Sequence, residues 1–108
     1  MELNKYQQQA STTAMYAEEY KILYPTLGLV GEAGEVAEKI KKMLRDEKGH
    51  LSSKRKEELV KELGDVLWYL AILAKDLGVD LNSIAQTNLD KLSSRKERGK
   101  ITGDGDNR

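Results

Sequence analysis

Residues 59–78 read LVKELGDVLWYLAILAKDLG, and this stretch decides the fold class. Its aliphatic residues recur at alternating spacings of four and three, which is the period of one face of an α-helix. That face consists of Leu59, Leu63, Val66, Leu70, Leu73 and Leu77. Gly78 follows directly and is typical of a helix end. The sequence therefore predicts an amphipathic helix here that ends at Gly78.

Two helical patterns precede this helix, and neither contains the alternating Val/Ile run that indicates a strand. The first should begin at Asn4, a favourable N-cap residue, and continue to Tyr20. Pro25 then breaks or restarts the helix. The second has an apolar face over residues 29–43 and should stop near Gly49, in a polar loop.

A fourth helix is expected to begin at Asp80, whose carboxylate can cap the first turn. It would place five apolar residues inward, namely Leu81, Ile84, Ala85, Leu89 and Leu92. The pattern then becomes polar, so residues 1–98 are predicted to form one helical domain and residues 99–108 a polar, Gly-rich tail. Four amphipathic helices predict an all-α, antiparallel four-helix bundle.

The composition limits the classes of function. The 108 residues include 18 Lys and Arg against 18 Asp and Glu, so no basic field for nucleic acid is expected. The absence of cysteine excludes disulfides, thiolate metal sites and cysteine nucleophiles. No apolar run approaches the roughly 18 residues of a membrane span, and residues 1–10 lack a signal-peptide pattern. We expect a cytoplasmic protein with no membrane or nucleic-acid partner.

Two pairs of acids interrupt the apolar faces. Glu32 and Glu35 lie three residues apart in GLVGEAGEVA, and Glu62 and Asp65 repeat that spacing in ELGDVL. Glycines flank both pairs, and each costs about 1 kcal/mol relative to alanine inside a helix, which indicates close approach of a neighbouring helix or ligand. The helical register places Glu62 among apolar residues and Glu32 at the border of its stripe. Both pairs are therefore expected to face a groove between the second and third helices.

Four carboxylates at close range cannot all remain ionised without compensation. A divalent cation would provide it, and all-oxygen ligation favours Mg²⁺, with Mn²⁺ as a substitute. Lys39 lies near the first pair, while Asn88, Lys91 and Arg95 share the inward side of the fourth helix. Cations beside a metal-binding carboxylate cluster would suit a polyphosphate.

Each of these features also has a structural interpretation. An isolated acid pair on a helix is usually solvated or paired with lysines. Lys91 and Arg95 can complement a helix C-terminus, and Asn88 can be a buried structural amide. His50 lies in a polar loop and is expected at the surface.

Aromatic residues on the first and third helices allow two interpretations. Tyr6, Tyr20 and Tyr69 are more typical of a core than of ligand stacking. Three residues along one edge of the first helix are candidates to contact a nucleotide base: Gln9, Thr13 and Tyr16. Trp68 projects opposite the leucine stripe with Ile72 nearby, and an exposed Trp/Ile patch usually marks a partner surface. We therefore expect homo-oligomerisation, as a dimer or tetramer, through the third helix.

The motifs resemble those of the all-α nucleoside triphosphate pyrophosphohydrolases of the MazG-like superfamily. The superfamily signature is an ExxE pair followed by an ExxD pair, and here EAGE begins at Glu32 and ELGD begins at Glu62. NLDKLSSR, beginning at Asn88, resembles the NxxKxxxR element of the superfamily, and the closing GDGDNR is similar to tails of single-domain members. The resemblance covers residues 3–108.

The resemblance implies Mg²⁺-dependent hydrolysis of a nucleoside triphosphate to the monophosphate and pyrophosphate, in house-cleaning of nucleotide pools. It implies that the metal ligands and catalytic residues are Glu32, Glu35, Glu62 and Asp65. The candidate substrate-binding residues are Asn88, Lys91, Arg95, Lys39, Gln9 and Thr13. It also implies an oligomer with the active site near subunit contacts. The preferred base and sugar stay open.

Two other classes compete with this interpretation. The first is a non-catalytic helical interaction module that uses the acid pairs and the Trp68/Ile72 face. The second is a carboxylate di-iron bundle, which normally requires Glu-x-x-His motifs. The only histidine, His50, is not in such a motif, so the di-iron interpretation is disfavoured.

Overall fold

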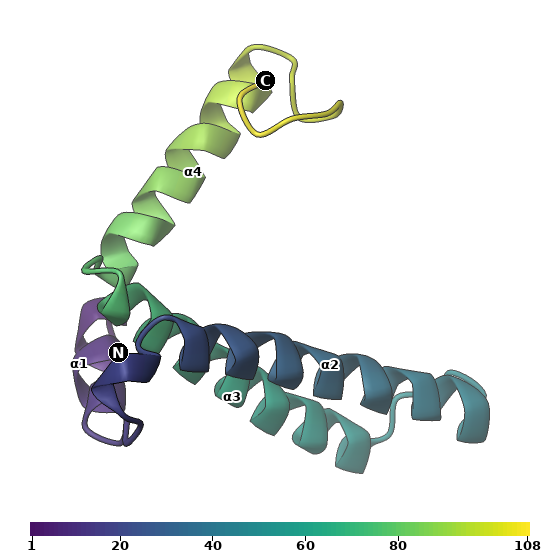
Figure 1. Cartoon of the computed structure of the whole chain (residues 1–108). Helices are drawn as coiled ribbons and strands as arrows, with labels where there is room; N and C mark the ends of the chain where they lie inside the picture. Colours follow the sequence, from purple (N-terminus) through teal and green to yellow (C-terminus); the bar gives the residue numbers. More distant parts are fainter.

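The computed structural model describes all 108 residues and contains four α-helices, a short 3-10 helix and no strand (Figure 1). The α-helices are α1 (Leu3–Ser11), α2 (Leu23–Asp46), α3 (Ser53–Asp76) and α4 (Leu81–Glu97). The 3-10 helix η1 (Glu18–Tyr20) lies between α1 and α2. The prediction of an all-α protein is confirmed. No helix is both long and apolar enough to cross a bilayer.

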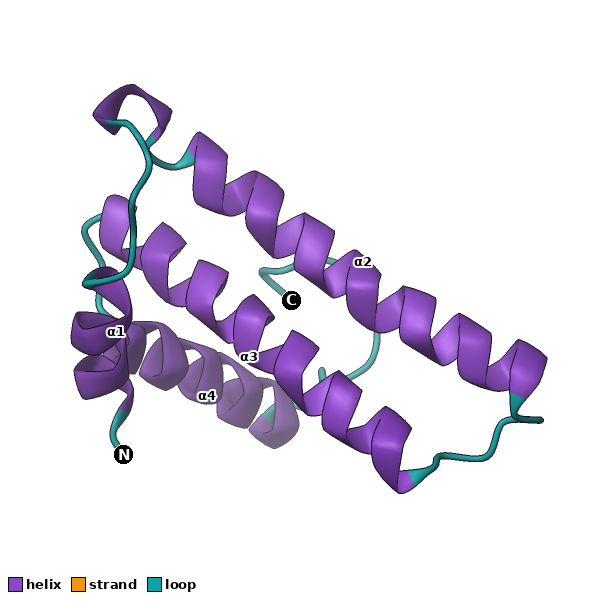
Figure 2. Cartoon of the chain, turned by 90° about the horizontal axis from the view of Figure 1, so that it is seen from below, coloured by secondary structure: helices purple, strands orange, loops and turns teal.

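The long helices α2 and α3 form an antiparallel hairpin that provides most of the packing in the chain (Figures 1 and 2). The alternating leucine face of α3 is covered only in part. Leu59, Val66 and Leu73 are half-buried, whereas Leu63 and Leu77 remain 55% and 57% exposed. One chain therefore leaves an apolar side of α3 open to solvent.

Helix α1 packs across the C-terminal part of α3, and one buried glutamine joins the two. The Gln7 side-chain amide donates to the carbonyls of Ala71, at 3.1 Å, and Val79, at 3.0 Å. The Gln7 side-chain oxygen accepts from the backbone N–H of Leu81, at 3.1 Å. A small core of Ala71, Ala74 and Leu81, with Tyr6 against it, forms beside these bonds.

The first helix ends at Ser11, so the expectation that it continues to Tyr20 is wrong. The hydroxyls of Ser11, Thr12 and Thr13 each donate to the carbonyl three residues earlier. Such local bonds compete with continuation of a helix. Pro25 lies in the first turn of α2, where a proline is tolerated, so the new helix begins at Leu23, two residues before this proline.

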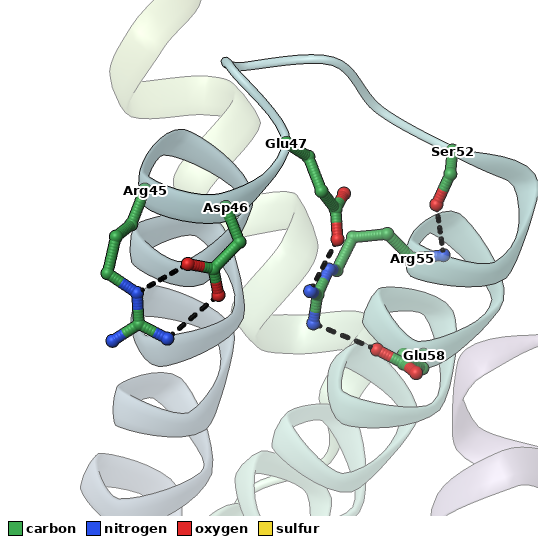
Figure 3. Close-up of polar contacts among 6 residues, drawn as sticks. All are labelled: Arg45, Asp46, Glu47, Ser52, Arg55 and Glu58. Carbon is green, nitrogen blue, oxygen red and sulfur yellow. Dashed lines mark hydrogen bonds and ion pairs between the residues drawn. The ribbon is translucent and has the colours of Figure 1, made fainter.

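The loop between α2 and α3 is held by ion pairs at its two ends (Figure 3). Arg55 contacts Glu47 across the loop, at 2.7 Å, and Glu58 one turn along α3, at 3.1 Å. The Ser52 hydroxyl accepts from the backbone N–H of Arg55 and caps α3. These contacts stabilise the turn that brings α3 back alongside α2.

Helix α4 begins at the predicted cap, because the Asp80 carboxylate accepts from the backbone N–H of Ser83 at 2.7 Å. It leaves the hairpin near α1 and points away from α2 and α3 (Figure 1). Ile84, Leu89 and Leu92 are therefore 37%, 59% and 41% exposed, and only Leu81 is buried among the apolar residues expected inward. The expected four-helix bundle does not close within one chain. Gln7 binds the turn before α4 on both sides and holds it against α1.

Candidate metal site between α2 and α3

Three carboxylates from two helices meet on the hairpin. Glu32 of α2 and Glu62 and Asp65 of α3 each offer an oxygen, and these oxygens lie within 4.8 Å of one another. Glu32 and Glu62 are partly buried, while Asp65 is exposed. Glu62 and Asp65 are three residues apart on α3, so they lie on the same side of that helix. The antiparallel pairing of α2 and α3 brings Glu32 next to them. We call these three residues the acidic trio.

The electrostatics of the acidic trio are unfavourable without a cation. Burial raises the pKa of the Glu32 carboxyl, and a hydrogen bond with Glu62 raises it further. The negative charges of Asp65, Glu62 and Glu35 act in the same direction. A proton or a cation is therefore favoured at this point of the α2/α3 interface.

Lys39 brings one positive charge to the acidic trio. Its ammonium group lies 3.5 Å from the Glu62 carboxylate, and the two side chains are 23% and 17% exposed. The sequence placed Lys39 among the candidate substrate-binding residues. In the structure it pairs with a candidate metal ligand, which compensates part of the negative charge.

Glu35, the fourth expected metal ligand, lies outside the acidic trio. It is exposed on α2, and its charge still acts on the Glu32 carboxyl. The structure thus brings three of the four signature acids together, and the fourth lies nearly one turn further along α2.

Two tyrosines lie close enough to the acidic trio for its charges to affect the pKa values of their hydroxyls. Burial raises the pKa of the Tyr6 hydroxyl, and the charge of Asp65 raises it further. Burial is also the main cause of the raised Tyr69 pKa, followed by Tyr24 and then Glu32. Tyr69 follows Asp65 by four residues on α3, so helical register alone can place it there. Tyr6 comes from α1 through tertiary packing, and no local signal predicts it.

The Tyr69 ring also explains one of the glycines near the acids. A Cβ atom at Gly28 would collide with the ring of Tyr69, so glycine is the residue that fits beneath it. At Gly31, Gly34 and Gly64, a Cβ atom would contact nothing beyond the local backbone of its own helix. The expected close approach is therefore confirmed at Gly28 and absent at the other three within one chain.

The expected Trp68/Ile72 surface is wrong, because α1 covers this side of α3. Ile72 is fully buried, and Trp68 is half-buried. The indole N–H of Trp68 donates to the Thr13 hydroxyl at 2.9 Å, and its ring meets Tyr69 edge-on. The exposed apolar side of α3 is a different one, made of Val60, Leu63, Leu67 and Leu70, which we call the α3 stripe.

The remaining candidate substrate-binding residues are not brought to the acidic trio in one chain. Gln9 is exposed, and Thr13 is engaged by Trp68. Asn88 is exposed on α4, which diverges from the hairpin (Figure 1). Lys91 and Arg95, further along α4, both contact Asp106 near the C-terminus.

The chain is similar to proteins of a mycobacterial phage and of a bacterium. The chain is 49% identical to the Gene 37 protein of Mycobacterium phage L5 over 114 aligned positions that cover all of both proteins. It is 36% identical to the protein YvdC of Bacillus subtilis (strain 168) over 64% of this chain and 70% of that protein. No solved structure matches.

A family model for the MazG nucleotide pyrophosphohydrolase domain matches residues 23–99. This segment contains α2, α3, α4 and the whole acidic trio. The matched region exceeds half of the 108 residues. The chain therefore belongs to the MazG nucleotide pyrophosphohydrolase domain family.

Proposed function

We propose that this protein is a divalent-metal-dependent nucleoside triphosphate pyrophosphohydrolase that converts (d)NTP to (d)NMP and pyrophosphate in house-cleaning of nucleotide pools. The observation that carries the proposal is the acidic trio, which sits inside the segment matched by the family. Carboxylates this close need a compensating cation, and Lys39 supplies only one charge.

The chemistry of the donors fits a hard divalent ion. Glu32, Glu62 and Asp65 would hold Mg²⁺ or Mn²⁺, with Glu35 as a further ligand, because carboxylate oxygens suit these ions. When bound, the cation neutralises the triphosphate and lowers the pKa of a water molecule.

The side chains around the cation have separate tasks in this proposal. A carboxylate oxygen of the four signature acids that is not engaged by the metal accepts the proton of the attacking water. Lys39 lies beside the trio, where its ammonium group can also contact a phosphate oxygen. The Tyr69 ring packs against Gly28 of α2, beside the carboxylates, where it would limit access of bulk water to their buried side. Tyr6 packs against the core of Ala71, Ala74 and Leu81, and the charge of Asp65 still acts on its hydroxyl.

We also propose a homo-oligomer, a dimer or a tetramer, that forms through the α3 stripe. Only 8 of the 108 residues are buried in one chain, and Val60 and Leu63 are 58% and 55% exposed. A chain of this size ordinarily buries a larger core, so a second copy on the α3 stripe would supply the missing burial. In such an assembly, Lys91 and Arg95 would serve an acidic trio on another copy.

The activity is tested by product analysis across ribo- and deoxynucleoside triphosphates with Mg²⁺ or Mn²⁺. We expect a monophosphate and pyrophosphate in equal amounts, with loss of at least about 100-fold in Asp65→Asn. Glu57→Gln, which removes an exposed acid of the same helix, should retain activity. Release of a nucleoside diphosphate and orthophosphate, or unchanged turnover in Asp65→Asn, would contradict the proposal.

A further inference from the structure

The C-terminal residues form a closed loop that folds back on α4. The Arg108 guanidinium lies inside this loop and donates to the carbonyls of Lys100, Ile101 and Gly105, at 3.0, 2.9 and 2.7 Å. Arg98 of the helix end donates to the backbone oxygen of Arg108 at 2.7 Å. The loop is therefore built by bonds to its own backbone and is more than a frayed end.

The loop places one carboxylate beside two cations of α4. The Asp106 carboxylate lies 3.4 Å from the Lys91 ammonium and 3.6 Å from the Arg95 guanidinium. These charges hold the pKa of Asp106 below its usual value, with Lys91 as the main cause. The Arg95 side chain is only 7% exposed and donates to the Asp106 carbonyl at 2.6 Å.

The two kinds of contact at Asp106 differ in strength. The backbone carbonyl accepts a short bond from Arg95, whereas the carboxylate contacts are longer than the about 2.7–2.9 Å of a good charge-assisted hydrogen bond. The carboxylate is also 88% exposed. The Asp106 side chain can therefore leave the two cations while its backbone and the loop stay in place.

We propose that the Asp106 carboxylate occupies an anion site formed by Lys91 and Arg95, and that a phosphate group must displace it to bind there. Carboxylate and phosphate oxygens accept hydrogen bonds from the same ammonium and guanidinium donors. Asp106 thus competes with the ligand and sets its affinity. The link to nucleotide hydrolysis rests on the proposed function, whereas the competition itself concerns only this loop.

The test uses the full chain and inorganic pyrophosphate, without metal or nucleotide, in a calorimetric titration. Asp106→Asn keeps the backbone carbonyl that Arg95 binds and removes only the charge. We expect it to bind pyrophosphate roughly two- to fivefold more tightly than the unmodified chain, the range for releasing exposed ion pairs. Lys91→Ala in the Asp106→Asn background should cancel the gain.

Asp104→Asn is the matched control, because it makes the same change in net charge and Asp104 takes part in no ion pair or side-chain hydrogen bond. Equal or weaker binding by Asp106→Asn, an equal gain in Asp104→Asn, or no binding to any of these chains would overturn the proposal. Hydrolysis is scored separately. If the chain hydrolyses nucleotides but Asp106→Asn does not bind pyrophosphate more tightly, only the competition by Asp106 is refuted. If Asp106→Asn binds pyrophosphate more tightly but the chain hydrolyses no nucleotide, only the proposed function is refuted.

Discussion

Lys39 of α2 and Glu62 of α3 form an ion pair across the hairpin, with the ammonium nitrogen 3.5 Å from a carboxylate oxygen. Both side chains are more than three-quarters buried, and Glu62 is also one of the acidic trio. Lys39 therefore compensates part of the negative charge that the acidic trio brings together. This relationship connects the stability of the hairpin to the binding of a cation.

Removing the charge of Lys39 tests whether the stability of the hairpin depends on compensation of the acidic trio. We expect Lys39→Met to lower the free energy of unfolding by about 1–3 kcal/mol without metal, because it leaves partly buried carboxylates unpaired. Added Mn²⁺ stabilises the folded state to which it binds. It should stabilise this variant more than the unmodified chain, because the acidic trio then carries negative charge that Lys39 no longer compensates. Denaturant unfolding with and without Mn²⁺ measures both effects.

Lys41→Met is the control for this experiment, because Lys41 makes an exposed pair with Glu38 on the same helix. It should change stability little and leave the response to Mn²⁺ unaltered. An equal response to Mn²⁺ in Lys39→Met and the unmodified chain would show that Lys39 does not compensate the trio.

The raised pKa of Glu32 predicts how metal-free stability depends on pH. The usual carboxyl pKa of Glu32 is 4.5, and the folded value is higher, so the folded state binds the proton more tightly. This contribution is present at low pH and is lost as pH rises through the folded value. We expect thermal stability to fall as the pH rises above the usual value of 4.5 and through the raised pKa of Glu32 in the unmodified chain. It should fall less in Asp65→Asn, which removes one of the causes of the raised pKa. Scanning calorimetry over this range measures both slopes, and identical slopes would contradict the electrostatic account.

Gly28 and Gly34 offer a matched pair on α2. Gly28→Ala should destabilise the chain by about 1–3 kcal/mol, because its methyl group would collide with the Tyr69 ring. Gly34→Ala should stabilise it by about 0.5–1 kcal/mol, because the position is helical and open. Chemical denaturation of both variants checks the prediction. Destabilisation by Gly34→Ala would mean that another surface covers this side of α2.

The α3 stripe predicts where copies of the chain associate. We expect Leu63→Glu combined with Leu67→Glu to convert the oligomer to a smaller species in analytical ultracentrifugation, because it places charge at the centre of the contact. Val30→Glu, at a more exposed apolar position on α2, should leave the oligomer intact. A monomer before any substitution, or dissociation by Val30→Glu alone, would reject this surface.

Local pattern predicted much of the fold. The leucine period located α3, and the capping carboxylate of Asp80 located the start of α4, because these signals act within a few residues. The apolar period does not show the end of α1, because it continues past Ser11. The helix ends there because three consecutive hydroxyl side chains donate to carbonyls three residues earlier. Trp68 was assigned to an open surface because the sequence does not show that α1 lies across that side of α3.

The candidate site was predicted to a similar extent. Spacing within each helix placed Glu62 and Asp65 on one side of α3, and packing against α2 brought Glu32 to them. The turn before α4 is bound by Gln7, which lies more than 70 residues away from Val79 and Leu81 in the chain. No local pattern carries such a contact. The positions of Lys91 and Arg95 relative to the trio were therefore beyond sequence reasoning.

The most direct test of the account is a titration with Mn²⁺, followed by electron paramagnetic resonance, of the unmodified chain, Asp65→Asn and Glu57→Gln. The account predicts saturable binding to the unmodified chain and to Glu57→Gln, and affinity reduced by at least tenfold in Asp65→Asn, because one carboxylate of the trio is lost. Circular dichroism verifies that each chain is helical. No binding by the unmodified chain, or equal binding by the folded Asp65→Asn chain, would contradict the claim that these three carboxylates hold a divalent cation.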